Sequence, residues 1–343
     1  MARIDLDLAH AYKPNPQRDE DYALLPLKMT FDDGGAYALL GPSGCGKTTL
    51  LNIISGLVKP SQGGVKFDGV EVKDKTPQQR NIAQVFQFPV IYDTMTVAQN
   101  LAFPLKNRGV PAERIKQRVG KIAEMLEMSA QLDKRAAGLA ADAKQKISLG
   151  RGLVREDVSA VLFDEPLTVI DPHLKWQLRR KLKQIHNELK LTLVYVTHDQ
   201  VEALTFADQV VVMTRGRAVQ IGTASELFER PRHTFVGHFI GSPGMNFLPA
   251  SLLPSAPAGA TKLGVRPEYV TIAPASAAGA VAATVTQAQD IGTYWLVTAT
   301  VGDGVIVRAR LSPDQTIPKV GATVWLGILG AHTCFYKDEE LVA

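Results

Sequence analysis

The stretch Gly41-Pro42-Ser43-Gly44-Cys45-Gly46-Lys47-Thr48 has the form G-x-x-x-x-G-K-[ST]. In front of it, residues 36–40 are apolar and predict a buried strand; behind it, residues 49–56 predict a helix that ends at a glycine. Strand, loop and helix in this order form a phosphate-binding loop, because glycines let backbone N–H groups surround phosphate oxygens at a helix N-terminus. We expect Lys47 to reach the β- and γ-phosphates of a nucleotide, and the Thr48 hydroxyl to bind Mg²⁺.

The composition is that of a globular protein long enough for two domains. The chain has 343 residues, of which 45% are hydrophobic and 21% charged, and its net charge is +4. So small a charge gives no reason to expect a nucleic-acid partner. The two cysteines, Cys45 and Cys334, fit a reducing compartment. Without an apolar signal core or a run of about 18 apolar residues, we expect a soluble cytoplasmic protein that reaches a membrane only through partners.

The rest of the first two thirds alternates between strand and helix patterns. Residues 4–8 alternate apolar and acidic side chains and predict an edge-like antiparallel strand. Helical periodicity from about 95 to 155 predicts a helical insertion. Further buried strands are predicted at 82–86, 159–163, 192–196, 210–213 and 219–221, with a hairpin near Asp68-Gly69. The fold class is therefore α/β, with a nucleotide-binding core.

The composition changes at Gly241-Ser242-Pro243-Gly244. From there to about residue 261 the chain is rich in Pro, Ala and Ser and predicts a linker with small turns. Short β-like runs follow between Gly and Pro residues, and they predict a small β-barrel of the oligonucleotide/oligosaccharide-binding type. We therefore predict two domains, at residues 1–240 and 241–343.

Two adjacent carboxylates end one of the buried strands. Asp164 follows four apolar residues, and near the phosphate loop it could hold Mg²⁺ through water. Glu165, beside it, is suited to polarise an attacking water. The alternative is a surface turn in front of Pro166, with no chemical role.

Gln87 and His198 also lie just past predicted strands. Gln87 could bind Mg²⁺ through its amide oxygen, or it could be a loop amide without a role. His198 could hydrogen-bond both a γ-phosphate and the attacking water. A histidine in this position could equally be structural.

Taken together and in order, these motifs resemble those of ATP-binding-cassette (ABC) ATPases. Tyr12, the phosphate loop, Gln87, Asp164-Glu165-Pro166 and Thr197-His198-Asp199 carry the resemblance. It extends to the C-terminal Gly264-Val265-Arg266-Pro267-Glu268, which is similar to the β domain of importer ATPases of the maltose and glycerol 3-phosphate type. Two stretches, Phe86-Gln87-Phe88-Pro89-Val90-Ile91-Tyr92 and Leu167-Thr168-Val169-Ile170-Asp171-Pro172-His173, look most like bacterial glycerol importer ATPases.

The resemblance implies roles for individual residues. It makes Glu165, His198 and Lys47 catalytic, and it makes Thr48, Gln87 and Asp164 the Mg²⁺ ligands. Tyr12 would stack on adenine, Gln87 would link the γ-phosphate to the membrane subunits, and Asp171 would face a second ATPase subunit. The ATP contacts that it implies are Tyr12, Gly41, Pro42, Ser43, Gly44, Cys45, Gly46, Lys47, Thr48, Thr49 and Gln87.

One stretch departs from the family. Where the family has Leu-Ser-Gly-Gly-Gln, this chain has Leu139-Ala140-Ala141-Asp142-Ala143. In the family this signature loop caps the ATP of the opposite subunit. Ala140 lacks the serine hydroxyl, and Asp142 places a negative charge where phosphate should lie. A simpler role for Asp142 is to N-cap a helix starting near Ala143, and both interpretations can hold together.

The resemblance implies the ATPase subunit of an importer, with ATP and Mg²⁺, two transmembrane permease subunits and, indirectly, a periplasmic or extracellular solute-binding protein. Glycerol is the first candidate solute, and glycerol 3-phosphate, a sugar or another polyol are alternatives. The altered signature favours a heterodimer with a second ATPase over a homodimer. It also leaves open an ATP-binding clamp with little hydrolysis. A soluble ABC ATPase of DNA repair or translation is a further alternative, although a second cassette and a long coiled coil are both missing.

Two further features each have two interpretations. Cys45 lies among loop N–H groups beside Lys47, which favours its thiolate, or else it is simply a small residue that the loop tolerates. The helix predicted from 174 to 189 carries Lys175, Arg179, Arg180, Lys181 and Lys183. We interpret these cations as a solvated helix face rather than a polyanion site.

Overall fold

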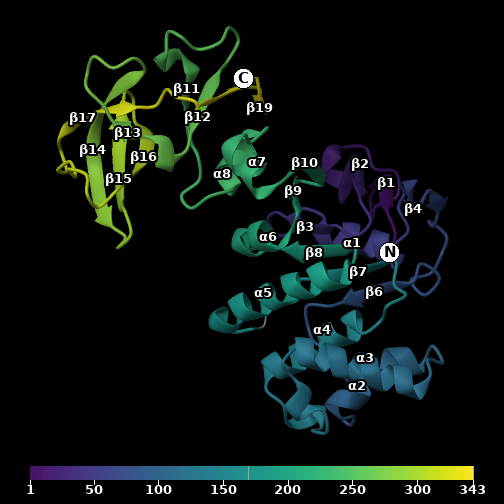
Figure 1. The fold of residues 1–343 in the computed structure, drawn as a ribbon. Coiled ribbons are helices and arrows are strands. Elements are labelled where there is room, and N and C mark those ends of the chain that lie inside the picture. The colour runs from purple at the N-terminus through teal and green to yellow at the C-terminus, as the bar shows by residue number, and fades with distance from the viewer. Residues whose placement is uncertain (169, 343) are drawn as a thin grey trace. The chain divides into compact units, whose positions relative to one another are not determined.

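The computed structural model describes residues 1–168 and 170–342. Val169, in the stretch 167–173, and Ala343, the end of the predicted second domain, lie outside the described residues. The chain divides into two compact units, Met1–Thr223 and Ala224–Ala343 (Figure 1). Among the described residues, no helix combines the length and apolar character that a membrane span needs.

A six-stranded sheet forms the centre of the first unit. Its strand order is β10-β9-β3-β8-β7-β6, and β3, β6, β7, β8 and β9 run parallel while β10 is antiparallel. The strands are β3 (Ala36–Leu40), β6 (Ile82–Val85), β7 (Ala160–Asp164), β8 (Leu193–Thr197), β9 (Gln209–Thr214) and β10 (Arg217–Gly222). β3, β7 and β8 are apolar on both faces because helices or a second sheet cover both sides. The predicted α/β core is confirmed.

A second sheet and one helix cover one face of this central sheet. The sheet is antiparallel with the order β2-β1-β4-β5, formed by β1 (Ile4–His10), β2 (Leu24–Phe31), β4 (Gln62–Phe67) and β5 (Val70–Glu71). It encloses α1 (Lys47–Ser55), and Leu6, Leu50 and Val194 share one apolar cluster there. The prediction of an edge strand at 4–8 was wrong, because β1 lies between β2 and β4. Alternation shows only that one face is buried; it does not show whether both edges are paired.

The opposite face carries helices and the predicted insertion. The helices on the sheet are α5 (Pro172–Leu189) and α6 (Gln200–Phe206), and the insertion has α2 (Val97–Lys106), α3 (Ala112–Met125) and α4 (Ala141–Leu153) (Figure 1). Short 3-10 turns occur at Asp19–Asp21, Ser129–Gln131 and Ala136–Gly138. α4 packs closely on its neighbours: a Cβ at Gly150 would lie 2.5 Å from Leu101, and one at Gly152 would lie 2.7 Å from Val85. The insertion is thus held tightly against β6.

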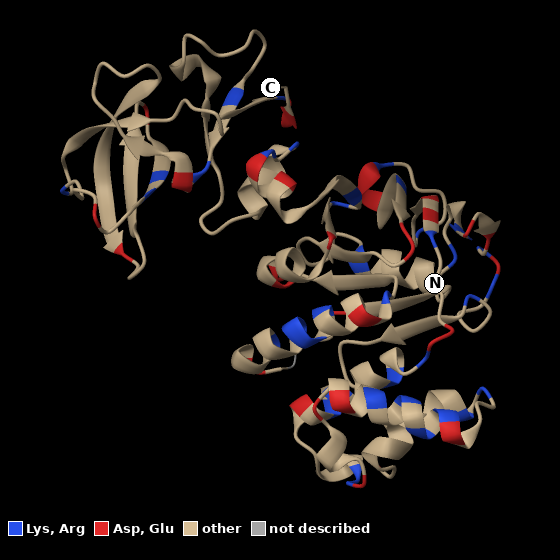
Figure 2. Cartoon of the chain, viewed as in Figure 1, with Lys and Arg blue, Asp and Glu red and all other residues tan. Residues whose placement is uncertain are grey.

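Basic residues lie along α5 (Figure 2), and its three lysines named above pair with acids. Lys183 lies 2.6 Å from Asp208, and Lys181 lies 3.4 Å from Glu127. Lys175 lies 3.9 Å from the buried Glu202. Neighbouring acids therefore offset much of this charge, which supports a solvated helix face over a polyanion site.

The second unit begins with two short helices and continues as antiparallel sheets. The helices are α7 (Ala224–Glu229) and α8 (Thr234–Phe239), and 3-10 turns lie at Ala250–Leu252 and Pro267–Tyr269. One sheet has the order β13-β17-β14-β15-β16, the other β11-β12-β18-β19. The strands are β11 (Asn246–Pro249), β12 (Lys262–Val265), β13 (Thr271–Ile272), β14 (Ala280–Asp290), β15 (Trp295–Val301), β16 (Val305–Leu311), β17 (Thr323–Gly327), β18 (Cys334–Lys337) and β19 (Glu340–Leu341). This arrangement fits the predicted small β-barrel class.

The observed division lies after Thr223, whereas the predicted one lay after Ile240. The guanidinium of Arg266, 1% exposed, donates hydrogen bonds to the carbonyls of Phe228, Leu227, Gly237 and Ile240. Its carbon lies 4.0 Å from the centre of the Phe228 ring. These contacts attach α7 and α8 to the β domain. The predicted linker at 241–261 also contains β11, which pairs with β12, so it is not simply a linker.

Candidate functional site

The phosphate loop connects β3 to α1 as the sequence predicts. Gly46 caps the helix with a φ of 103°, and a Cβ at Gly41 would lie 2.2 Å from the Met213 carbonyl oxygen. Both positions therefore require glycine. The helix ends at Gly56, whose φ is 88°. This confirms the strand, loop and helix around the motif.

Lys47, the first residue of α1, is held inside the loop. Its side chain is buried, and Nζ donates hydrogen bonds to the carbonyl oxygens of Gly41 at 2.8 Å and Pro42 at 3.0 Å. These carbonyls compensate the cost of removing an ammonium group from water. The positive charge is thereby fixed inside the loop.

Tyr12 lies beside the first turn of the same helix. Its hydroxyl is 3.2 Å from Oγ1 of Thr49, although the two residues are 37 positions apart. The tyrosine is 66% exposed, so most of its ring is accessible. An aromatic face next to a phosphate loop can stack on a nucleotide base.

Two of the predicted metal ligands meet at the carboxyl end of β7. The Thr48 hydroxyl donates a hydrogen bond of 3.3 Å to Oδ1 of Asp164, the last residue of β7. Gln87 lies two residues beyond β6, the parallel neighbour of β7. The pKa of Asp164 lies above its ordinary value, mainly because the carboxyl is buried. The Glu165 carboxylate raises this pKa further, and the hydrogen bond from Thr48 lowers it only in part. A hydroxyl, a carboxylate and an amide are the hard oxygen ligands that suit Mg²⁺, which usually completes its octahedron with water and substrate phosphates.

Glu165 and His198 meet at the same edge of the sheet. His198 Nδ1 lies 3.2 Å from Oε2 of Glu165. Glu165 has a φ of 46°, and its N–H donates to the carbonyl of Val196 in β8 at 3.0 Å. A non-glycine residue with positive φ is held there by its surroundings, and such positions cluster at functional sites. The structure therefore brings the predicted carboxylate and imidazole together.

Two residues that the sequence analysis did not select support this pair. The Thr168 hydroxyl donates to Oε2 of Glu165 at 3.2 Å. The buried Glu202 accepts hydrogen bonds of 2.9 Å from the hydroxyls of Tyr195 and Thr197, just before His198. Glu202 stands three residues after Asp199, which caps α6, and this spacing was an available signal. Nothing in the sequence pattern singled out Thr168.

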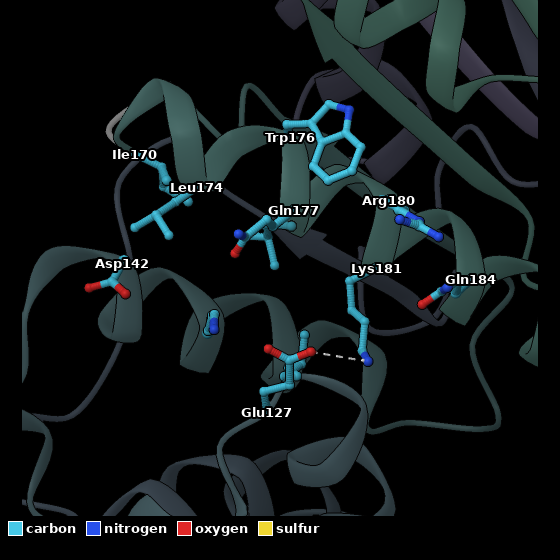
Figure 3. A pocket seen from close by; sticks show the side chains of 12 residues that line it. Glu127, Asp142, Ile170, Leu174, Trp176, Gln177, Arg180, Lys181 and Gln184 are labelled. Carbon is cyan, nitrogen blue, oxygen red and sulfur yellow. Dashed lines mark ion pairs between the residues drawn. The ribbon is translucent and has the colours of Figure 1, made fainter.

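Next to Glu165, Gln145 in α4 donates a hydrogen bond of 2.5 Å to the Pro166 carbonyl, so the helix after the signature loop contacts the segment that leads to Asp171. Asp171 caps α5 by accepting a hydrogen bond of 2.9 Å from the His173 N–H. A cavity of about 400 Å³ separates α4 from α5, with Asp142 and Ile170 toward one end (Figure 3). The prediction that Asp142 caps the helix was wrong. α4 begins at Ala141, its N-cap is Ala140, and no side chain makes the capping bond.

Comparison with known proteins now identifies the family. The model of the ABC transporter family matches residues 24–168, and the model of the TOBE domain matches residues 263–335. The sn-glycerol-3-phosphate import ATP-binding protein of Agrobacterium fabrum is 40% identical over 338 residues, covering 94% of each chain. This chain belongs to the ABC transporter family.

Other relatives of this ABC chain agree. The corresponding Yersinia enterocolitica protein is 38% identical, and the match covers 92% of both chains. The trehalose import ATP-binding protein of Mycobacterium tuberculosis is 46% identical over 252 residues, 74% of this chain but only 63% of the relative's length. Among solved structures, CbiO1 of Clostridium perfringens, described as part of an ABC transporter complex, has a TM-score of 0.60 and 27% identity, covering 66% of this chain and 90% of that one. The predicted family and fold class are confirmed.

In this ABC chain, the structure supports the second interpretation of Cys45, a small residue that the loop tolerates. The residue is 3% exposed, and burial raises the pKa of its thiol more than the nearby Lys47 ammonium lowers it. Sequence alone shows the neighbouring cation but not the burial. The expectation of a favoured thiolate was therefore wrong.

Several exposed apolar side chains flank and follow Gln87 in this ABC chain. We call residues 86–92, which include Gln87, the aromatic segment. Its exposed members are Phe86, Phe88, Val90 and Tyr92. Arg151, near the end of α4, donates a hydrogen bond of 2.6 Å to the Val90 carbonyl and stacks over the Tyr92 ring at 4.8 Å. Such a group of exposed apolar side chains is typical of a contact surface.

Proposed function

We propose that this ABC chain is the ATP-binding and ATP-hydrolysing subunit that energises import of a small polyol or carbohydrate. The observation that carries the proposal is the cluster at one sheet edge. It joins the buried Lys47, the Thr48–Asp164 pair and the Glu165–His198 pair. The first supplies charge for phosphate, the second oxygen ligands for Mg²⁺, and the third a base with an orienting imidazole.

In the proposed mechanism, each residue acts at a defined place. Lys47 and the loop N–H groups stabilise the charge that develops on the γ-phosphate. Glu165 accepts a hydrogen bond from the attacking water and polarises it, and His198 keeps Glu165 and the water in line. Mg²⁺, held by Thr48, Asp164 and Gln87, would neutralise charge on the β- and γ-phosphate oxygens.

Pairing of two ATPase subunits is part of the proposal. This chain and a second ATPase subunit would close head to tail around two ATP molecules, and their reopening would drive alternating access in two permease subunits. The signature loop and Asp171 would face the second ATPase, whereas the aromatic segment would contact the permeases. The chain would therefore work at the cytoplasmic face of the membrane, supplied with solute by a binding protein outside.

For the solute, we propose glycerol first. Its support is the resemblance of residues 86–92 and 167–173 to glycerol importer ATPases. Relatives are named for import of sn-glycerol 3-phosphate and of trehalose, so both compounds are alternatives. The solute touches other subunits, and the ATPase carries no direct specificity for it.

The test is solute-stimulated ATP hydrolysis by the reconstituted importer. The complex would be purified through a tag on this chain and placed in vesicles with its binding protein. We expect the rate of ATP hydrolysis to rise when glycerol is added on the side of the membrane that holds the binding protein. Glycerol 3-phosphate or trehalose added there should not raise the rate. Stimulation by one of these instead would correct the solute. If no membrane subunit copurifies with this chain, a soluble ATPase is favoured. If the complex binds ATP normally but shows no single-turnover hydrolysis, an ATP-binding clamp with little hydrolysis is favoured.

A further inference from the structure

The ring of Tyr12 is supported at two separate places. Its hydroxyl contacts the Thr49 hydroxyl, and its ring packs against a second aromatic ring. That ring belongs to His10, with centroids 4.6 Å apart and planes at 85°. This is the edge-to-face geometry that aromatic pairs prefer. An otherwise exposed side chain is thereby restricted in its rotation.

His10 is itself fixed. The residue is 6% exposed, and its Nδ1 lies 3.2 Å from the hydroxyl of Ser61. Its Nε2 is buried and has no hydrogen-bond partner among the described residues. An imidazole in this setting costs stability unless another contact compensates for it. The only ring that contacts it among the described residues is that of Tyr12.

Ser61 also fixes the backbone between the two rings. Its hydroxyl oxygen accepts a hydrogen bond of 3.1 Å from the Ala11 N–H and lies 3.0 Å from the Ala11 carbonyl oxygen. The His10 carbonyl accepts a hydrogen bond of 2.9 Å from the Ala23 N–H. The pairing of β1 shifts register between Leu8 and His10, which turns the end of the strand. The end of β1 is therefore held by Ala23 and Ser61, the residues that immediately precede β2 and β4.

We propose that His10, held by Ser61, is a positioning residue for the base end of the nucleotide site. It keeps the Tyr12 ring oriented before the base arrives, so that less rotational freedom is lost on binding. This inference rests on the proposed ATP site. It concerns only the part of the site that touches the base, whereas Lys47 and the phosphate loop act at the other end.

The experiment separates these two ends with two probes, MgATP and magnesium tripolyphosphate. Tripolyphosphate has the phosphate chain of ATP but no base or ribose. Binding of both would be measured calorimetrically on the full chain, for the unchanged protein and for His10→Ala, Ser61→Ala, Tyr12→Ala and Tyr12→Phe. Because Ser61 is exposed, Ser61→Ala should leave the fold intact. The Ser61→Ala variant therefore tests the positioning role even if His10→Ala does not fold.

We expect His10→Ala to weaken MgATP binding about fivefold, and Ser61→Ala to weaken it about twofold. Both should bind tripolyphosphate like the unchanged chain. His10→Ala combined with Tyr12→Ala should be no weaker than Tyr12→Ala alone, because the histidine acts through the tyrosine. Tyr12→Phe keeps the ring and should lose less than Tyr12→Ala.

Three results would overturn the inference. They are unchanged MgATP binding in both His10→Ala and Ser61→Ala, equal losses for both probes, or losses that add in the double variant. A different result bears on the proposed function. If the unchanged chain binds tripolyphosphate and MgATP equally poorly, the proposal of a nucleotide site is wrong.

Discussion

Nδ1 of His198 lies 3.2 Å from Oε2 of Glu165, and the same carboxylate oxygen accepts a hydrogen bond from the Thr168 hydroxyl. The contacts of His198 and Thr168 with Oε2 thus fix the orientation of the Glu165 carboxylate. In the proposed mechanism, the other oxygen, Oε1, would accept the hydrogen bond from the attacking water. Loss of the charge on this carboxylate should therefore affect chemistry more than binding.

Glu165→Gln should slow single-turnover ATP hydrolysis about 10²- to 10⁴-fold while leaving MgATP affinity within about threefold. The amide keeps the shape of the side chain but cannot act as a base. Thr168→Val is the matched control, since it removes a hydrogen bond to the same oxygen and keeps the charge; we expect a loss of less than about tenfold. Near-normal turnover in Glu165→Gln would remove the proposed role of this residue.

Cys45 should react slowly with iodoacetamide near neutral pH. Alkylation requires the thiolate, and burial raises the pKa of this thiol above its ordinary value of 9.0. The thiolate fraction is therefore small at pH 7, and the rate should still be rising above pH 9. The measurement is peptide mapping after timed labelling from pH 7 to 10, with the urea-unfolded chain as the control. Equal rates for folded and unfolded chains at pH 7 would contradict the burial argument.

The signature loop predicts that two composite sites hydrolyse ATP unequally. If the second ATPase is a different chain with an intact signature, Glu165→Gln here should nearly abolish hydrolysis by the complex. The equivalent change in the partner should have a milder effect. Coexpression and purification of each single variant complex would measure both. An active complex with two copies of this chain and no other ATPase would exclude the heterodimer.

Repair of the loop gives a second measurement on the same feature. Ala140→Ser restores a hydroxyl at the helix N-terminus, and Asp142→Gly removes the negative charge. The double variant should raise hydrolysis at the site that this loop faces, by about tenfold if the altered residues are what limits it. An Asp142→Asn control removes the charge but keeps the size. No change in either variant would mean that the loop already works as it is.

Arg151→Met should weaken stimulation by the permease subunits without changing ATP binding by the isolated chain. The substitution removes the hydrogen bond to Val90 and the stacking on Tyr92, so the aromatic segment loses its support from α4. Arg151→Lys keeps the charge but not the planar group, and it should rescue only partly. The readout is hydrolysis of the complex relative to that of the chain alone. Full stimulation in Arg151→Met would count against this contact.

The chemistry of the site could be predicted because it depends on local sequence. A phosphate loop needs glycines at fixed spacing, and carboxylates at the ends of parallel strands necessarily share an edge of the sheet. For this reason the sequence points to Asp164, Glu165 and His198, and the structure places Asp164 3.3 Å from Thr48 and Glu165 3.2 Å from His198. Their roles in hydrolysis are proposals that the variants above test.

What could not be predicted depends on burial and long-range packing. The pKa of Cys45 follows from neighbours that the sequence does not show. The start of α4 at Ala141 contradicts the usual preference for a polar cap, because tertiary packing of the helix overrides it. The place of β1 inside its sheet depends on β4, more than 50 residues away in the chain.

Arg266 has a consequence for exchanging parts between relatives. Its guanidinium donates to carbonyls of α7, of α8 and of Ile240, the residue that caps α8, all of which precede the β domain. A chimera joined after Ile240 would bring a buried cation without its own carbonyls, and those helices would lose their anchor. A chimera joined after Thr223 transfers cation and acceptors as one piece. A functional chimera is therefore expected when the exchange point lies ahead of α7, so that both helices move together with the β domain.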